Sequence, residues 1–237
     1  DKNYLVIVPE QFTMQTQKDL CLAHPKGGIM NIDVLSFGRL AYRVFEEVGQ
    51  DARVVLDDEG KNLVLRKIAG ECEKDLKVFK GNLKKQGYIS EVKSVLSEFA
   101  QYGVDFERLD DFMKEVPPES YLHYKLDDIR TIYEKFEEYL SEKYITKEEM
   151  LDVLSDAVPY SDILKGSVVA MDGFTGFTPV QNRLIGELFS VCEKVMITVT
   201  MDGRENPYVY EHPYQIFALG KQMVTSLMKI AGEKKTE

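Results

Sequence analysis

The sequence is poor in the residues that build disulfide frameworks and metal centres. It contains three cysteines and three histidines among 237 residues, and no two cysteines form a CxxC pair. Cys21, Cys72 and Cys192 lie far apart, and the histidines share no ligand spacing with them. We therefore expect no disulfide framework and no zinc or other metal site, and the composition favours a reducing, cytoplasmic setting.

Long apolar runs are also absent. No stretch approaches the roughly 20 residues that a membrane-spanning helix needs, and no signal peptide is recognisable. We therefore expect no contact with a membrane. The chain begins Asp1-Lys2-Asn3 without an initiator methionine and enters an apolar run at once, which we interpret as the start of a fragment.

An excess of basic charge is missing as well. Thirty Lys and Arg side chains stand against forty Asp and Glu, for a formal net charge of -10. Non-specific DNA binding depends on basic groups that displace counterions. Any contact with nucleic acid must therefore come from a local group of residues or be supplied by a partner protein. The hydrophobic fraction of 44% is enough for a packed core, in one large domain or in a domain interrupted by an insertion.

No complete catalytic motif is present. A GxxxxGK[ST] phosphate loop does not occur, since Gly60-Lys61-Asn62 and Gly220-Lys221-Gln222 lack both the upstream glycine and the hydroxyl residue. The acidic groups Asp57-Asp58-Glu59 and Glu148-Glu149 are better explained as charges favourable to helix starts. We therefore expect no catalytic residue in this chain, and no complete site for ATP hydrolysis or DNA cleavage.

What is present begins with two strand–helix units. Tyr4 to Val8 is a continuous apolar run, typical of a strand buried on both faces of a parallel sheet. Thr13 can cap a helix reaching about Ala23. Residues 32–37 indicate a second strand, and a helix follows from Gly38 to Val48. Strands alternating with helices predict an α/β domain.

The following hundred or so residues lose strand character, and their apolar residues recur with helical spacing. Thr146-Lys147-Glu148-Glu149 is a capping box that opens a helix to Val158. Strand character returns at 167–171 and 194–199 around a helix, and a last helix runs from about Tyr214. The sequence thus predicts a parallel-sheet α/β domain, residues 1–57 and 161–237, with an all-α subdomain inserted at 58–160.

Three motifs follow predicted strands, where ligands of open α/β sheets sit. In the first, Pro9 to Thr13, Gln11 and Thr13 offer uncharged hydrogen-bond partners to phosphates or bases, and Phe12 offers a stacking face. The alternative is an ordinary strand–helix turn with a capping threonine and a core phenylalanine.

The second motif is Ser36 to Arg43. It places Arg39 and Arg43 one helical turn apart with Tyr42 beside Arg39. A cationic and aromatic cluster at a helix amino terminus suits a phosphodiester and a stacked base. The alternative is that Phe37 and Tyr42 belong to the core and that both arginines are simply solvated.

The third motif is Met171 to Gln181. Asp172 directly follows an apolar strand, where a Walker B motif places its magnesium-associated carboxylate. The next residue, Gly173, has no side chain that could deprotonate water. The alternative is a glycine-rich turn with two buried phenylalanines, Phe174 and Phe177.

Taken in order, these motifs resemble the N-terminal motor domain of UvrD-type superfamily-one helicases, which is built on a P-loop NTPase sheet. The amino-acid sequences of Val8–Thr13, Ser36–Arg43 and Asp172–Pro179 resemble those of the AddB family. AddB is one of the two subunits of AddAB-type ATP-dependent helicase–nucleases. The resemblance implies a role in processing DNA double-strand breaks for recombinational repair. It also implies a heterodimer with an AddA-like motor and nuclease subunit, and scanning of single-stranded DNA for a Chi-type sequence.

The family's phosphate loop lies upstream of this chain, and its nuclease and iron–sulfur cluster lie downstream. The resemblance therefore implies ATP and Mg²⁺ for the whole protein but no cofactor in this region. An active helicase of this type would carry Glu at Gly173 and a Gln after Asp202, so that Asp172-Gly173 resembles a degenerate Walker B motif. By motif match, the residues implied to contact DNA are Gln11, Thr13, Phe37, Arg39, Tyr42, Phe174 and Phe177.

Two alternative hypotheses for the function remain. In one, the region is an ATP-hydrolysing motor whose phosphate loop precedes residue 1, although Gly173 argues against this. In the other, the fold serves only as a docking surface for the partner motor.

Overall fold

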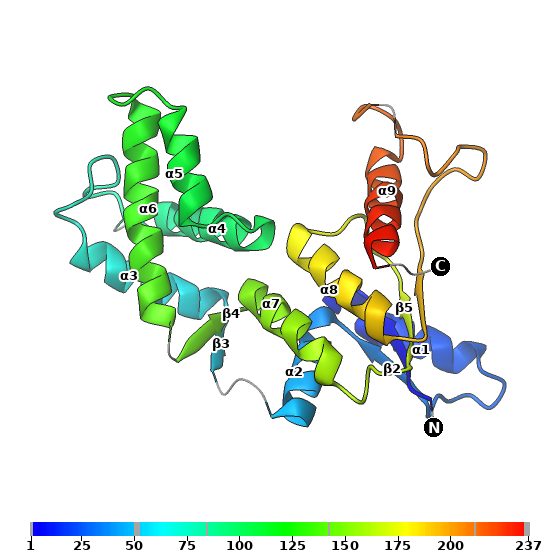
Figure 1. Ribbon diagram of the computed structural model, residues 1–237. Coiled ribbons are helices and arrows are strands. Elements are labelled where there is room, and N and C mark those ends of the chain that lie inside the picture. Colours follow the sequence, from blue (N-terminus) through cyan, green and yellow to red (C-terminus); the bar gives the residue numbers. More distant parts are fainter. Residues whose placement is uncertain (1, 50–52, 84, 142, 211, 235–237) are drawn as a thin grey trace. The chain divides into compact units, whose positions relative to one another are not determined.

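The computed structural model describes residues 2–49, 53–83, 85–141, 143–210 and 212–234. The chain forms two compact units: an α/β unit, residues 1–51 with 151–237, and a helical unit, residues 52–150 (Figure 1). These divisions fall slightly earlier than the boundaries expected at 57 and 160. Among the described residues, no helix combines the length and the apolar character needed to cross a membrane.

A parallel four-stranded sheet forms the centre of the α/β unit. Its strand order is β2-β1-β5-β6, with bounds Tyr4–Ile7 for β1, Ile32–Leu35 for β2, Val168–Met171 for β5 and Lys194–Ile197 for β6. In the register of the sheet, Ile7 lies opposite both Leu35 and Met171. The carboxyl ends of these strands therefore lie in line at one edge of the sheet, which we call the carboxyl edge.

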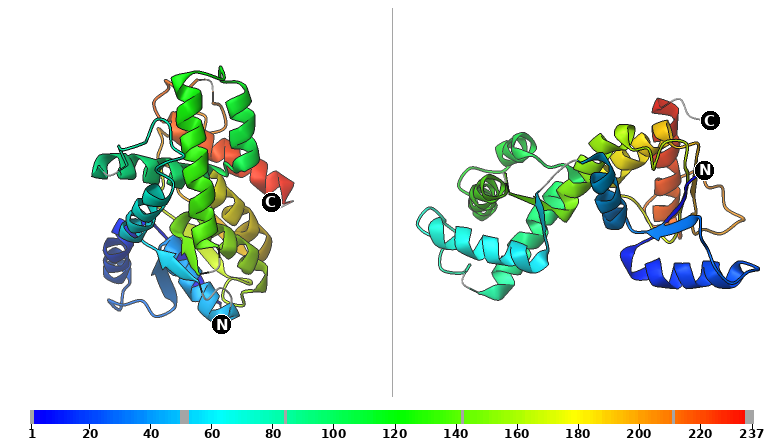
Figure 2. Two further views of the ribbon diagram at one scale, coloured as in Figure 1. Left: turned by 90° about the vertical axis from the view of Figure 1, so that its left-hand side faces the viewer. Right: turned by 90° about the horizontal axis from the view of Figure 1, so that it is seen from below.

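Helices cover both faces of the sheet, with α1 on one face and α2 and α8 on the other (Figure 2). This placement follows from right-handed crossovers, because the chain steps one way from β1 to β2 and the opposite way toward β5 and β6. The helices of the unit are η1 (Glu10–Phe12), α1 (Thr13–Ala23), α2 (Phe37–Val48), η2 (Val158–Tyr160), α8 (Pro179–Val191) and α9 (Ala218–Glu233). A further helix, α7 (Lys147–Ala157), spans the boundary between residues 150 and 151, so its first residues belong to the helical unit and the rest to the α/β unit.

Two expectations for the first strand and helix are wrong. In β1, burial alternates: Leu5 and Ile7 are fully buried, whereas Tyr4 is 43% exposed. An apolar run does not say how closely its second face is covered, and α1 buries only Thr13. Thr13 is the first residue of α1 rather than its cap, and its hydroxyl donates a hydrogen bond to the Glu10 carbonyl at 3.0 Å. The last helix also begins at Ala218, later than expected.

The helical unit contains α3 (Asp58–Glu71), α4 (Gln86–Tyr102), α5 (Phe106–Lys114) and α6 (Tyr121–Leu140), packed around a common apolar core. It is not all-α, because β3 (Val54–Leu56) pairs in parallel with β4 (Tyr144–Thr146). A three-residue strand carries too few positions for period-2 alternation to stand out from its surroundings. The capping box is confirmed: the Thr146 amide donates to Glu149 Oε2 at 2.8 Å, and the Glu149 amide donates to Thr146 Oγ1 at 3.2 Å.

Candidate nucleic-acid interface

Three turns, 8–13, 36–39 and 172–178, meet at the carboxyl edge of the α/β unit. The rings of Phe37 and Phe174, which follow β2 and β5, lie with their centroids 5.3 Å apart. A Cβ atom on Gly173 would lie 3.5 Å from Cδ of Pro9 and 3.7 Å from Cδ2 of Phe12, in the turn after β1. Side chains separated by more than 130 residues in the sequence are therefore neighbours, as the common register of parallel strands requires.

An aromatic cluster of Phe37, Phe174 and Phe177 occupies the centre of this edge. The Phe177 centroid lies 5.1 Å from that of Phe174 and 6.5 Å from that of Phe37. Phe37 is only 7% exposed and belongs to the core, whereas Phe174 and Phe177 are half-buried. Such an arrangement offers parts of two aromatic faces to solvent, supported from below by a third ring.

Helix α2, which begins with Phe37 of this cluster, also carries cationic and aromatic groups. Ser36 caps the helix by accepting a hydrogen bond from the Arg39 amide at 3.3 Å, which fixes its first turn. Arg43 is bound to Asp33 at 2.6 Å, whereas exposed Arg39 takes part in none of the salt bridges found in the described part of the chain. Tyr42, one turn beyond Arg39, is 57% exposed. A guanidinium at a helix amino terminus is suited to an anion such as a phosphate.

The turn after β1 contributes exposed and buried groups. Gln11 is exposed and Phe12 is 46% exposed, so an amide and an aromatic face are both accessible. Thr13 is only 4% exposed, and its hydroxyl is used within the turn by the bond to Glu10. Thr13 thus stabilises the turn that presents Gln11.

The turn after β5 holds Asp172 in a fixed position. The Thr198 hydroxyl, just beyond β6, donates a short hydrogen bond to the Asp172 carboxylate. Thr198 was not identified from the sequence, because nothing in the pattern signals a partner 26 residues away. Gly173 adopts φ +79°, a conformation that side-chain-bearing residues rarely adopt, so a glutamate at this position would be strained.

The described residues contain no group of three or more His, Cys, Asp or Glu that could hold a metal ion. The cysteines are free thiols, and Cys72 is buried in the helical unit, where its thiol contacts the Ile68 carbonyl at 3.0 Å. Asp172 is therefore an isolated carboxylate beside a threonine, not part of a cluster of ligands.

Comparison with known proteins identifies the family. The family model described as "ADDB, N-terminal" matches residues 1–237. Several AddB proteins, named as the B component of an ATP-dependent helicase/deoxyribonuclease, are similar: that of Lachnoclostridium phytofermentans is 45% identical over 235 residues, covering 99% of this chain and 20% of the relative. The protein of Thermoanaerobacter pseudethanolicus is 38% identical over 229 residues, which cover 97% of this chain and 20% of the relative. The protein of Alkaliphilus metalliredigens is 36% identical over 202 residues, which cover 85% of this chain and 18% of the relative. The chain spans about a fifth of the length of these relatives. It belongs to the AddB family and matches the N-terminal region of that family from end to end.

Proposed function

We propose that this region forms one wall of a path for single-stranded DNA in a helicase–nuclease that processes broken DNA ends for recombinational repair. The names of its relatives, each the B subunit of an ATP-dependent helicase/deoxyribonuclease, support DNA as the polymer and a complex with a further subunit. We propose that this partner, of AddA type, is the motor. The observation that carries the proposal is the convergence of the turns after β1, β2 and β5 at the carboxyl edge.

The exposed side chains at this edge suit a single strand. Arg39 contacts a phosphate or a base edge, and Gln11 supplies a hydrogen bond to a base. Tyr42 and the half-buried faces of Phe174 and Phe177 stack against bases, each worth roughly 1–3 kcal/mol. Contacts to base edges depend on sequence, which fits scanning for a Chi-type sequence.

The buried members of the motif have a different role. Phe37 and Thr13 are buried, so we assign them the role of holding the exposed groups in position rather than of stacking on DNA or bonding to it directly. We therefore explain their presence in the motif by the need to fix the positions of the exposed side chains that contact DNA.

The turn after β5 is best explained as a degenerate Walker B motif. Asp172 retains the position of a magnesium-associated carboxylate, but the positive φ of Gly173 disfavours the glutamate that would activate water. We therefore propose that ATP hydrolysis in the complex belongs to the partner subunit.

The chain's own residues do not fit the family's cofactors. ATP with Mg²⁺ needs a phosphate loop, and the sequence contains none. A cysteine-ligated iron–sulfur cluster needs four thiolates, whereas this chain has three cysteines, of which Cys72 lies in the core of the helical unit. We derive no step through either group.

The test is an Arg39→Ala variant of the full-length protein in complex with its motor partner. Fluorescence anisotropy with a labelled single-stranded oligonucleotide should show about 5- to 150-fold weaker binding, as expected for loss of a bidentate base contact. If Arg39 contacts only a phosphate, the salt dependence of log K should instead flatten by about 0.7.

The matched control is Lys26→Ala. Lys26 is exposed in the loop that leads from α1 to β2, near the amino ends of the strands, and the substitution removes the same charge. Binding by Arg39→Ala that equals binding by Lys26→Ala, in both strength and salt dependence, would refute the assignment.

A further inference from the structure

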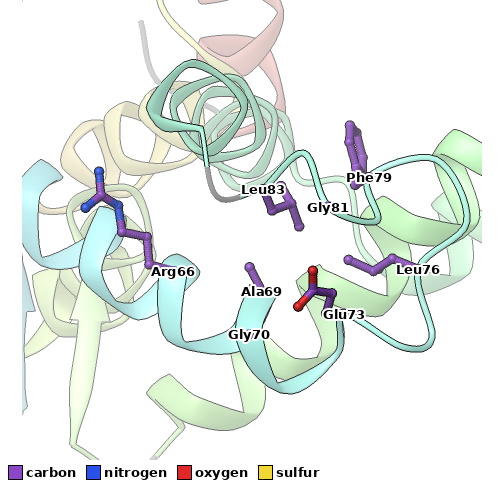
Figure 3. Close-up of a pocket in the computed structure, with 8 residues that line it drawn as sticks. All are labelled: Arg66, Ala69, Gly70, Glu73, Leu76, Phe79, Gly81 and Leu83. Atoms are coloured by element: carbon purple, nitrogen blue, oxygen red, sulfur yellow. The ribbon is translucent and has the colours of Figure 1, made fainter.

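The helical unit contains a pocket that the motifs at the carboxyl edge do not involve. It has a volume of about 310 Å³ and lies between the second half of α3 and the segment that leads to α4. Figure 3 shows Ala69, Leu76 and Leu83 converging on the pocket, with the Glu73 carboxylate among them. These three apolar side chains and Phe79 are at most 7% exposed, so the floor of the pocket is part of the core. The volume is at the lower end of the range for small-molecule sites, about 300–1,000 Å³.

The wall opposite α3 is held rigidly by one buried carboxylate. Asp128, on α6, is 1% exposed and accepts hydrogen bonds from the backbone amides of Lys77, Val78 and Phe79 at 2.8, 2.7 and 2.8 Å. Charge-assisted bonds of this kind are stronger than bonds between neutral groups. The pocket is therefore preformed, and a ligand need not order the segment when it binds.

Positive charge is concentrated around this pocket. Residues 66–85 contain seven basic and three acidic side chains, in a chain whose net charge is -10. Arg66, Lys74, Lys80 and Lys85 are exposed, and none of them takes part in a salt bridge found within the described residues. Arg66 itself lines the pocket. Local unpaired cations in an acidic protein favour a polyanionic ligand at this place.

Two further features distinguish a nucleic acid from an acidic peptide. Tyr88 is 36% exposed and its ring packs edge-on against Phe79, with the centroids 6.3 Å apart, so an aromatic face lies near the cations. The Glu73 carboxylate lines the pocket, and a carboxylate, with about four acceptor positions, can accept a hydrogen bond from the exocyclic amino group of a base. The side chains of an acidic peptide offer no such donor.

We propose that this pocket receives one base of a single-stranded DNA, with the flanking phosphates on Arg66, Lys80 and Lys85. Bases with an exocyclic amino group, such as cytosine, are preferred over thymine because of Glu73. The inference rests on the proposed function only in taking DNA as the polymer, and the contact is separate from the one at the carboxyl edge.

Gly70 allows the pocket to be filled without disturbing the fold. It lies in α3 and lines the pocket, and a Cβ atom added to it would meet no other atom within 4 Å. A side chain in place of glycine also favours the helix. Gly70→Leu therefore closes the pocket, whereas Gly70→Ala is the matched control with a similar gain in helix propensity.

The experiment measures binding of labelled oligo(dC) and oligo(dT) to the full-length protein, in the wild-type and Arg39→Ala backgrounds. Gly70→Leu should weaken oligo(dC) binding about 5- to 150-fold, the effect of losing one stacked base, while Gly70→Ala binds like wild type. Glu73→Gln should reduce the preference for oligo(dC) over oligo(dT). Unchanged oligo(dC) binding by Gly70→Leu in both backgrounds would overturn the proposal.

The phosphate contacts have their own test. Lys80→Ala combined with Lys85→Ala should flatten the salt dependence of log K by about 1.4, which corresponds to two contacts on a single strand. The control is Lys114→Ala combined with Lys143→Ala, which removes the same charge from exposed positions of the same unit. An equal slope for the two double variants would contradict phosphate binding here.

The outcomes separate the two proposals. Loss of binding in Gly70→Leu with no effect of Arg39→Ala would support the pocket and refute the contact at the carboxyl edge. The reverse result would refute the pocket alone. If Gly70→Leu left DNA binding intact but weakened binding of an oligo-glutamate peptide, the occupant would be an acidic protein segment and the proposal would be wrong.

Discussion

Replacing Asp128 by asparagine should destabilise the helical unit strongly, although the two side chains have nearly the same shape. The carboxylate accepts three backbone hydrogen bonds, one through Oδ1 and two through Oδ2. An asparagine keeps a single acceptor oxygen and turns an NH₂ group toward backbone donors, so it loses at least one bond and leaves buried amides unsatisfied. One lost bond to a charged group at about 1.5–3 kcal/mol, together with the weakening of the bonds that remain once the charge is gone, amounts to about 3 kcal/mol of unfolding free energy.

The assay is equilibrium unfolding in urea, followed by circular dichroism, together with hydrogen exchange of the amides of residues 77–79. With a slope of about 2 kcal/mol/M, the midpoint should fall by about 1.5 M and exchange at these amides should accelerate. The control is Asp127→Asn, which removes only an exposed ion pair with Lys77 and should cost no more than about 1 kcal/mol. Equal midpoints for the Asp127 and Asp128 variants would refute the role assigned to Asp128.

Three further predictions concern buried or strained groups. Burial and the adjacent Glu149 carboxylate raise the pKa of Glu137 to about 7 from 4.5, so the folded state holds this proton more tightly than the unfolded state. The contribution of this group to stability should therefore decline as pH rises from about 4.5 through 7, and Glu137→Gln should remove that dependence in urea titrations at several pH values. Gly173→Ala should cost about 1–3 kcal/mol through its positive φ. In Gly176→Ala, by contrast, the new Cβ meets open space and the melting temperature should hardly change. Lys61 is 3% exposed and is bound to Glu148 at 2.7 Å, so Lys61→Ala should cost about 3–5 kcal/mol, and a double-mutant cycle with Glu148→Ala should show strong coupling.

Local patterns predicted most of the elements of the fold. The apolar runs at Tyr4 and Val168 form neighbouring parallel strands, and the run at Ile32 pairs with the first of them on its other side. The helices after these strands begin close to the expected residues. The capping box at Thr146 needed only the spacing of two side chains, because it is closed within four residues. Interactions of this range can be recognised in a sequence since both partners lie in the same window.

Burial was harder to predict than element type. The exposure of one face of β1 depends on which elements pack against that face, and the strands β3 and β4 depend on their pairing with each other. In both cases the neighbours come from distant parts of the chain. Phe37 illustrates the same limit, because its motif suggests a stacking platform whereas its ring lies in the core beneath Phe174 and Phe177. A motif identifies residues that act together but does not say which of them reach solvent.

By itself, the sequence determined the alternation of strands and helices, the absence of a phosphate loop and the order of motifs that marks the AddB family. Only the tertiary structure decided that Arg43 is bound to Asp33 while Arg39 is not, that Asp172 is held by Thr198, and that Asp128 fixes the wall of a pocket. The physical reason is that charge pairing and burial are set by contacts between segments. Such contacts exist only after the sheet and the helical core have brought distant residues together.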